Sequence, residues 1–305
     1  FRPAGSVAML PLARPLLYEA WTRLNWPKVE SVTGPVDVTH ATGLIPAATA
    51  VPLVVTVHDL AFLHTPEKFT RHGAALMRRS IDVVRRRASL VICSSQATIA
   101  DCVEAGFPSE QLRHVPLGVD RIEVTADEVA RVRRRYLLPE QFVLFVGTIE
   151  PRKNLARLVE AMRRPGMPGP LVVAGATGWG DAHEDVDDGA THFLGFVPGA
   201  DLPALYAAAT VFAYPSEREG YGLPVAEAMA QGTPVVTSRG TSTEEVAGGA
   251  AVLVDPFDVD DIARGIVTAA DDAETWRAAG RRRASGLGWR SVAEATLAVY
   301  RELAP

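Results

Sequence analysis

The chain has 305 residues, of which 48% are hydrophobic and 22% are charged. A chain of this length is about twice a typical domain, and its composition excludes a disordered chain, a fibrous rod and a disulfide-stapled miniprotein. Thirty-one basic and 36 acidic residues give a net charge of −5, which argues against a general nucleic-acid binder.

The sequence carries no pattern typical of a leader or a membrane span. It begins at Phe1 without a charged and then apolar stretch, so we expect no signal peptide. The longest uncharged run, residues 41–57, is 17 residues long and contains two prolines, which is unlike a membrane helix. Two cysteines, Cys93 and Cys102, are too few for a disulfide framework and are typical of a reducing compartment. We therefore expect a cytoplasmic protein in which both are small buried residues.

Short apolar runs alternate along the chain with segments of helical periodicity. The predicted strands cover residues 36–39, 53–57, 90–94, 113–116, 142–147, 171–175, 211–215, 234–238 and 251–254. Most of these runs are continuously apolar, as in parallel strands buried on both faces. Helices are predicted over residues 71–88, 155–163 and 224–231, the last ended by Gly232.

This alternation predicts an α/β protein made of two Rossmann-like, doubly wound parallel-sheet domains, with ligands at the carboxyl ends of the strands. A break near residues 118–128, ahead of an arginine-rich segment at 129–136, indicates a linker. We therefore expect domains at residues 1–120 and 121–288. Residues 1–35 have the pattern of helix and loop and contain no recognisable strand.

The most informative segment is EGYGLPVAE, residues 219–227, which follows the predicted strand 211–215. Gly220 and Gly222 allow the backbone to approach a ligand closely, and the proline at 224 suits the first turn of a helix. The amides of Leu223 and Val225 would then face a phosphate at the positive end of the helix dipole.

The two glutamates of this segment are candidate ligands for hydroxyl groups. Glu227 falls at the end of the first helical turn, where it can accept hydrogen bonds from a sugar or ribose diol. Glu219 precedes the glycines and is expected to face the same cavity. The alternative is a strand–loop–helix corner with solvated glutamates.

Two further segments place polar side chains at predicted strand ends. Arg152 and Lys153 follow strand 142–147, where they can neutralise a diphosphate or lie solvated in a loop between strand and helix. His58 follows strand 53–57, where it can bind a sugar hydroxyl, transfer a proton or serve as a structural histidine. The next residue, Asp59, would either orient His58 or cap the following segment.

Together these motifs resemble the retaining GT-B-fold glycosyltransferases of family GT4, the group 1 transferases. Residues 219–227 resemble the E-x7-E signature of that family, and residues 147–154 resemble its G-x-x-E-P-R-K-N loop. Residues 193–198 resemble its nucleotide-base turn, and 116–120 its interdomain segment, with Leu117 in place of asparagine. The resemblance covers nearly all of the chain from residue 36 and implies that a helix at 289–305 packs back toward the first domain.

The resemblance also implies a role for each candidate residue. Glu227 would bind the ribose, Arg152 and Lys153 the diphosphate, Glu219 the hydroxyls of the transferred sugar, and His58 that sugar from the first domain. The nucleotide-sugar-binding residues would be Val197, Gly220, Tyr221, Gly222, Leu223, Val225 and Glu227. Transfer would proceed with retention by front-face attack, and the two cations would stabilise the departing diphosphate in place of a metal.

The donor is expected to be a nucleotide diphosphate sugar, first GDP-mannose and second a UDP-sugar such as UDP-glucose, with no other cofactor. The acceptor would be a glycan, a glycolipid or a small molecule. Metal binding by the D-x-D strings at 185–187 and 258–260 is disfavoured, because the second has the pattern of a helix cap.

Three alternatives stay open. One is a nucleotide-sugar epimerase on the same scaffold. Another is a non-catalytic nucleotide-sugar-binding remnant, considered because residues 1–35 lack the first strand and glycine-rich loop of the resembling family. The cationic face of helix 71–88, with Arg78, Arg79, Arg85 and Arg86, would either contact anionic lipid peripherally or be merely solvated.

Overall fold

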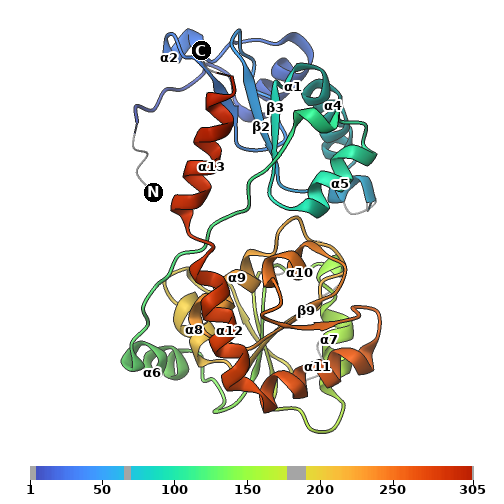
Figure 1. Cartoon of the computed structure of the whole chain (residues 1–305), viewed down its shortest axis with the longest axis vertical. Helices are drawn as coiled ribbons and strands as arrows, with labels where there is room; N and C mark the ends of the chain where they lie inside the picture. Colours follow the sequence, from blue (N-terminus) through green and yellow to red (C-terminus); the bar gives the residue numbers. More distant parts are fainter. Residues whose placement is uncertain (1–4, 65–69, 177–189, 304–305) are drawn as a thin grey trace. The chain divides into compact units, whose positions relative to one another are not determined.

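The computed structural model describes residues 5–64, 70–176 and 190–303. The chain divides into two compact units, which are described separately (Figure 1). The first unit comprises Phe1–Pro116 with Val292–Pro305, and the second comprises Leu117–Ser291. Each unit contains a parallel sheet flanked by helices, which confirms the predicted α/β class.

The first unit has a four-stranded parallel sheet in the order β1-β2-β3-β4. Its strands are β1 (Thr39–Ala41), β2 (Leu53–Val57), β3 (Leu90–Cys93) and β4 (Leu112–His114). The first strand begins three residues later than predicted. Its ladder starts where the Thr39 amide donates to the Pro52 carbonyl, and proline itself has no N–H with which to extend the pairing.

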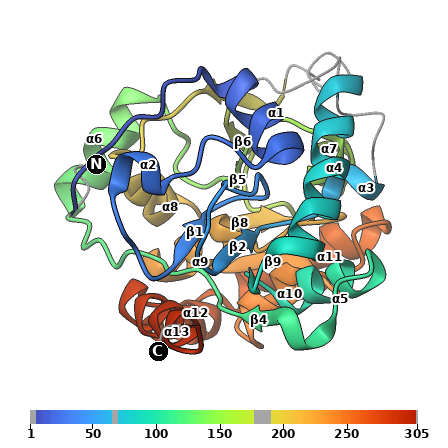
Figure 2. The same cartoon turned by 90° about the horizontal axis from the view of Figure 1, so that it is seen from above.

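Helices cover both faces of this sheet (Figure 2). One face carries Val55 and Val91, which pack into a cluster with residues of α4 (Arg71–Arg87) and α5 (Gln96–Glu104). The other face carries Val54 and Ile92, which cluster with Val299 of α13 (Trp289–Arg301). Burial on both faces explains why these strands are continuously apolar. The described residues of this unit also form α1 (Arg14–Leu24), α2 (Glu30–Thr33), α3 (Ala61–His64) and the 3-10 turn Ser109–Gln111.

The second unit has a six-stranded parallel sheet in the order β10-β9-β8-β5-β6-β7. Its strands are β5 (Val143–Val146), β6 (Leu171–Ala174), β7 (His192–Gly195), β8 (Val211–Tyr214), β9 (Val235–Ser238) and β10 (Val252–Val254). The chain moves outward from β5 through β6 to β7, then returns to pair β8 with β5 and moves outward in the other direction. This reversal makes the β5–β8 boundary a topological switch point.

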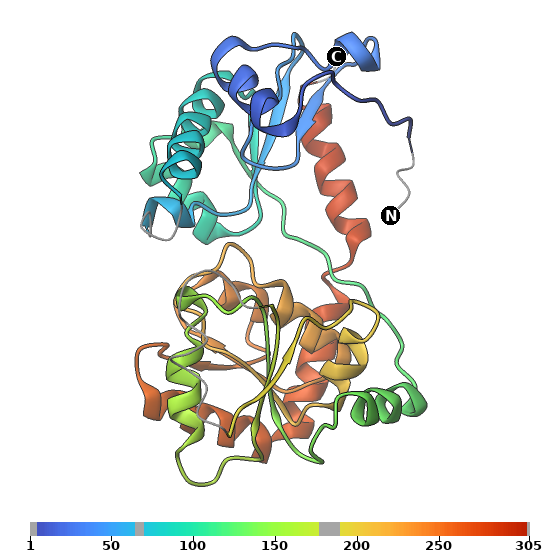
Figure 3. The same cartoon turned by 180° about the vertical axis from the view of Figure 1, so that it is seen from behind.

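Helices also cover both faces of the larger sheet (Figure 3). On one side α7 (Leu155–Met162) packs against α11 (Val259–Asp271), and on the other α9 (Leu223–Gln231) packs against α8 (Leu202–Ala208) and α12 (Ala273–Ser285). The described part of this unit also contains α6 (Ala126–Arg135), α10 (Ser242–Ala247) and the 3-10 turn Pro151–Lys153.

Two predictions in this unit are corrected by the structure. Residues 193–198 were expected as a turn, but His192–Gly195 forms β7, a short and partly exposed strand at the edge of the sheet. The expected linker ends earlier than predicted, because a capping box between Thr125 and Glu128 starts α6 at Ala126. Within the described part of the chain, no helix has both the length and the apolar character that a bilayer crossing requires.

Candidate functional site

The loops after β5 and β8 lie side by side at the switch point of the larger sheet. The first loop carries Arg152 and Lys153, and the second carries Glu219. In open α/β sheets, ligands bind in the crevice outside the carboxyl ends of the strands at this position. The strand order therefore brings together charged residues that are far apart in the sequence.

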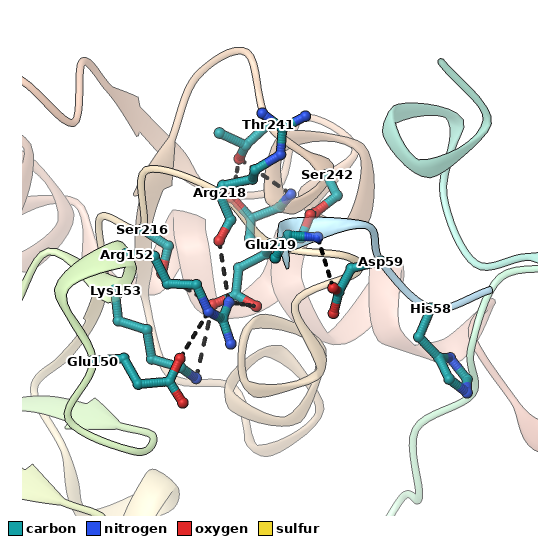
Figure 4. Close-up of polar contacts among 12 residues, drawn as sticks. His58, Asp59, Glu150, Arg152, Lys153, Ser216, Arg218, Glu219, Thr241 and Ser242 are labelled. Atoms are coloured by element: carbon teal, nitrogen blue, oxygen red, sulfur yellow. Dashed lines mark hydrogen bonds and ion pairs between the residues drawn. The ribbon is translucent and has the colours of Figure 1, made fainter. Parts of the chain in front are cut away.

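Glu150, Arg152, Lys153 and Glu219 form a charged cluster at these loops. Within it, Arg152 forms two ion pairs (Figure 4). Its Nη1 lies 3.0 Å from Glu219 Oε2, and its Nε lies 2.8 Å from Glu150 Oε2. Burial alone would lower the pKa of Arg152, but the two carboxylates raise it above its usual range. The guanidinium is therefore permanently charged and is held near the carboxyl ends of the central strands β5 and β8.

Lys153 is buried beside the same carboxylate. Its Nζ donates a 2.8 Å hydrogen bond to the Tyr214 hydroxyl and lies 3.7 Å from Glu219 Oε1. The Tyr214 hydroxyl in turn donates to Glu219 Oε1 at 2.8 Å. Burial lowers the pKa of Lys153, while Glu219 acts to raise it. Burial also raises the pKa of Tyr214, so the phenol stays protonated.

The conformation of the loop after β5 determines where Arg152 and Lys153 lie. They belong to the 3-10 turn Pro151–Lys153, which ends at Asn154 in a left-handed conformation with φ 62°. The Asn154 side-chain amide donates to the carbonyls of Pro215 and Pro256, at 2.9 and 2.6 Å. A Cβ at Gly147 would lie 2.8 Å from Lys153 Nζ, so glycine leaves room for the ammonium group.

The start of α9 is shaped by Gly222. Its φ of 104° suits glycine, and a Cβ there would lie 2.7 Å from Thr243 Cγ2. The structure corrects the expectation of a free Val225 amide, because that N–H donates to the Gly222 carbonyl at 3.0 Å. Gly220 lies in the turn before α9, and Leu223 is the first residue of α9.

Other predicted binding residues have their side chains in the core. Val197 and Val225 are buried in the hydrophobic cluster of the second unit. Tyr221 is buried with them and donates its hydroxyl to the Leu117 carbonyl at 2.8 Å. Burial raises the pKa of Tyr221 to about 12. These three side chains therefore support the backbone around the site.

Glu227 lines a cavity of about 240 Å³ inside the second unit. Its Oε2 accepts a 2.9 Å hydrogen bond from the buried hydroxyl of Tyr206, and Asp120 lines the same cavity. Burial raises the pKa of Glu227, the Tyr206 hydrogen bond counters that rise, and Asp120 adds to it. Other lining residues are Gly118, Val119, Ile122, Gly199, Leu202, Pro203, Leu223, Gln231 and Trp289.

Glu219 and Glu227 lie in different surroundings in the structure. Glu219 does not line the Glu227 cavity, because Arg152, Lys153, Tyr214 and Ser216 hold its carboxylate in the charged cluster. Sequence reasoning also missed Tyr214 and Tyr206. A tyrosine within an apolar strand or helix was the available signal, since a buried hydroxyl usually has a hydrogen-bond partner.

His58 lies in the first unit, directly after β2. Its side chain is exposed, and its Nε2 lies 3.2 Å from the Thr42 carbonyl oxygen. Asp59 accepts from the Ala61 amide at 3.0 Å, at the start of α3 (Figure 4). Of the two roles considered for Asp59, the structure therefore favours the cap.

The D-x-D string at 258–260 belongs to a helix cap. The carboxylate of Asp258 accepts from the Asp260 and Asp261 amides and caps α11, as predicted. Residues 185–187 lie outside the described residues. Among the residues that the structure describes, no three histidine, cysteine or acidic side chains form a group that could hold a metal ion.

Two other features of the first unit have structural explanations. The cationic face of α4 is partly neutralised, because Arg79 pairs with Glu19 at 2.7 Å and Arg85 with Asp82 at 3.4 Å. Cys93 and Cys102 are buried, with their sulfur atoms 3.8 Å apart, which confirms that both are core residues.

Models of known families match most of the chain. The model described as "Glycosyl transferases group 1" matches residues 131–284, and the model "Glycosyltransferase Family 4" matches residues 5–122. The chain is 34% identical to O-antigen chain mannosyltransferase B of Escherichia coli over 268 residues, which are 82% of this chain and 70% of that protein.

A second relative and a solved structure are similar over comparable lengths. The MMP alpha-(1->4)-mannosyltransferase of Mycolicibacterium hassiacum is 30% identical over 298 residues, 88% of this chain and 71% of that protein. The crystal structure of HepE of Anabaena in complex with UDP and glucose has a TM-score of 0.70 and 22% identity. The match covers 88% of this chain and 77% of that one.

Proposed function

Because this chain belongs to the group 1 glycosyltransferases and has the GT-B fold, we propose that it transfers a mannosyl group from GDP-mannose with retention of configuration. The acceptor is a glycan, a glycolipid or a small hydroxyl compound. The observation that carries this proposal is the pair of cations, Arg152 and Lys153, at the switch point of the larger sheet.

The chemistry of the transfer fits these groups. In the proposed step the bond between the sugar C1 and the diphosphate oxygen breaks, and the acceptor oxygen bonds to C1 on the same face. The acceptor proton passes to an oxygen of the departing diphosphate. Negative charge therefore accumulates on the leaving group, where the guanidinium of Arg152 and the ammonium of Lys153 stabilise it. Held in place before the reaction, these cations need little reorganisation.

The remaining polar groups suit the rest of a nucleotide sugar. We assign the ribose hydroxyls to Glu227, whose half-buried carboxylate lines the cavity beside α9. The transferred sugar is assigned to Glu219. The backbone around Gly220, Gly222 and Leu223 would contact the diphosphate at the start of α9.

Two relatives named as mannosyltransferases support mannose as the transferred sugar. UDP-glucose is the second candidate donor, since the structural neighbour HepE is described in complex with UDP and glucose. The two candidate donors differ in both the base and the sugar, so an experiment has to vary both.

Binding is tested by titrating GDP, UDP and ADP into the protein while following thermal unfolding. A ligand at a hundredfold excess over its Kd stabilises the fold by about 2.7 kcal/mol. We expect GDP to stabilise most, and the gain to shrink in Glu227→Gln. Equal or absent stabilisation by the three nucleotides would contradict the proposed donor.

Turnover is tested next with GDP-mannose and UDP-glucose, with and without EDTA, against a panel of sugar acceptors. We expect mannose transfer that persists in EDTA, and NMR of the product should show the donor's anomeric configuration. An inverted product would overturn the retaining mechanism. Nucleotide-sugar binding without transfer or epimerisation would favour the non-catalytic alternative.

A further inference from the structure

Tyr214 is the last residue of β8, and its side chain is fully buried. Its hydroxyl accepts from Lys153 Nζ and donates to Glu219 Oε1, each at 2.8 Å. Lys153 Nζ and Glu219 Oε1 are themselves 3.7 Å apart, which is longer than a direct hydrogen bond. The phenol hydroxyl is thus inserted between the two charges.

The ring of Tyr214 has little freedom to move. It packs against the rings of Phe145 and Phe212, with centroids 5.7 Å away in each case. The Tyr214 carbonyl accepts from Thr237 Oγ1 at 3.0 Å on the neighbouring strand β9. Because the backbone and ring are both fixed, the hydroxyl occupies a defined position at the strand end.

A bridged ion pair differs chemically from a closed one. An ammonium group has three N–H donors, and a direct pair with Glu219 would orient Lys153 toward the carboxylate. The bridge satisfies one donor with a neutral oxygen and holds the ammonium close to Glu219 without direct contact. A hydrogen bond donated by the ammonium group favours the charged form of Lys153, whereas burial disfavours it.

We propose that Tyr214 is a positioning residue for glycosyl transfer, whose hydroxyl holds Lys153 and Glu219 at the separation that the reaction requires. The inference rests on the proposed function, in which Lys153 binds the diphosphate and Glu219 the sugar. Tyr214 acts through these two side chains and is not assigned a contact with substrate.

The test replaces Tyr214 with phenylalanine, which keeps the ring and removes the hydroxyl. We expect kcat to fall by about 10- to 100-fold, the range for losing a hydrogen bond to a charged group, with a smaller change in donor KM. The alkaline limb of the pH profile should also move to lower pH, because Lys153 loses an acceptor and deprotonates more easily.

Other charged groups face Lys153 and remain in this variant. They are Glu219 from the β8–α9 loop, and Arg152 and Glu150 from its own loop. If Lys153 closed directly onto Glu219 instead, its pKa would rise and the alkaline limb would move to higher pH. That shift, or an unchanged kcat and pH profile, would overturn the inference.

Tyr136→Phe is a matched control in the same unit. The Tyr136 hydroxyl donates at 2.8 Å to Asp201, a buried carboxylate that is also paired with two arginines, Arg131 and Arg135. Both variants delete a phenol hydroxyl from a carboxylate cluster, but only Tyr214 lies at the switch point. We expect the control to keep its kcat and pH profile.

A double-mutant cycle with Lys153→Met separates the two ways in which the inference can fail. If Tyr214 acts through Lys153, removing its hydroxyl from the Lys153→Met protein should cost little further activity. Full activity in Lys153→Met would refute the proposed function itself. Additive losses would refute the inference alone. Should Tyr214→Phe fold poorly, 3-fluorotyrosine at position 214 retains the hydroxyl as a weaker acceptor and should shift the alkaline limb in the same direction.

Discussion

Glu219 and Glu227 stand at the two ends of one nine-residue segment, yet their surroundings have opposite electrostatic character. Glu219 contacts Arg152, Lys153 and the hydroxyl of Tyr214. Glu227 faces a cavity, accepts from the Tyr206 hydroxyl, and has its pKa raised by burial. The start of α9 separates them and directs each to a different environment.

This difference shows that two identical residues of one sequence signature can lie in two different electrostatic environments. A carboxylate surrounded by cations is part of a fixed charge network that orders those cations. A carboxylate held by a phenol beside a cavity retains the capacity to accept hydrogen bonds from a ligand. The predictions below test this division of roles.

The largest effect is expected from Lys153→Met, which removes one of the two cations at the switch point. Transfer should fall by about 100-fold or more, because preorganised charge at the leaving group is lost. Lys28→Met, at an exposed position in the first unit, is the control and should keep its activity. Steady-state kinetics with the preferred donor measures both, and equal rates in the two variants would contradict the role of the charge cluster.

Glu227→Gln tests whether the carboxylate that lines the cavity binds the donor. Losing a hydrogen bond to a charged acceptor should weaken donor binding by about 10- to 100-fold. In the wild type, donor affinity should fall as the pH drops through the raised pKa of Glu227. In the glutamine variant, donor affinity should not change over this pH range. Calorimetric titration across pH measures both effects, with the exposed Glu274→Gln as control.

The same substitution has a predicted effect on stability without ligand. Because the folded pKa of Glu227 lies above its ordinary value, the folded state binds more protons than the unfolded state just above that value. Wild-type stability should therefore decrease as pH rises through this window, and the glutamine variant should lose that decrease. A parallel pH dependence in both proteins would contradict the burial of this charge.

Gly222→Ala tests the helix start that separates the two glutamates. Its positive φ and the contact that a Cβ would make with Thr243 predict a loss of about 1–3 kcal/mol in unfolding free energy. Gly286→Ala is the control, because Gly286 has an ordinary helical φ of −86° and its Cβ would meet its nearest neighbour at 3.5 Å. Urea unfolding measures both, and equal losses would argue against strain at Gly222.

The smallest effect is expected from Thr125→Ala at the start of α6. Breaking this capping box should cost about 1 kcal/mol of stability while leaving transfer unchanged. Thermal unfolding and a rate assay on the same sample check both parts. A loss of activity larger than the loss of folded protein would show that the site depends on α6.

The sequence predicted most of the larger sheet because its strands are buried on both faces. Residues 171–174 and 211–214 are continuously apolar, and they form β6 and β8 within one residue of the predicted ends. The edge strand β7 was not predicted: it is short and only partly buried, and its apolar residues Phe193 and Leu194 were assigned to a turn through the resemblance. Strand order was likewise beyond prediction, because it depends on pairing between distant segments.

For the candidate site, the charged residues were predictable but their partners were not. Arg152, Lys153 and Glu219 stand out at predicted strand ends, whereas their mutual contact follows from the neighbouring positions of β5 and β8. The bridging role of Tyr214 depends on which face of β8 the side chain occupies and on the length of the Lys153 side chain. The spacing of residues along the sequence does not predict that these two side chains meet.

Under the proposed function, the contacts of Asn154 have a consequence for engineering donor specificity. Its single amide group ties the loop after β5 to the loop after β8, through Pro215, and to the loop after β10, through Pro256. If only the β8–α9 loop were replaced by that of a homologue, the new loop would lack the matching loops after β5 and β10 that it contacts through Asn154. Successful exchange of specificity in this scaffold would therefore require the three loops to be moved together as one cassette.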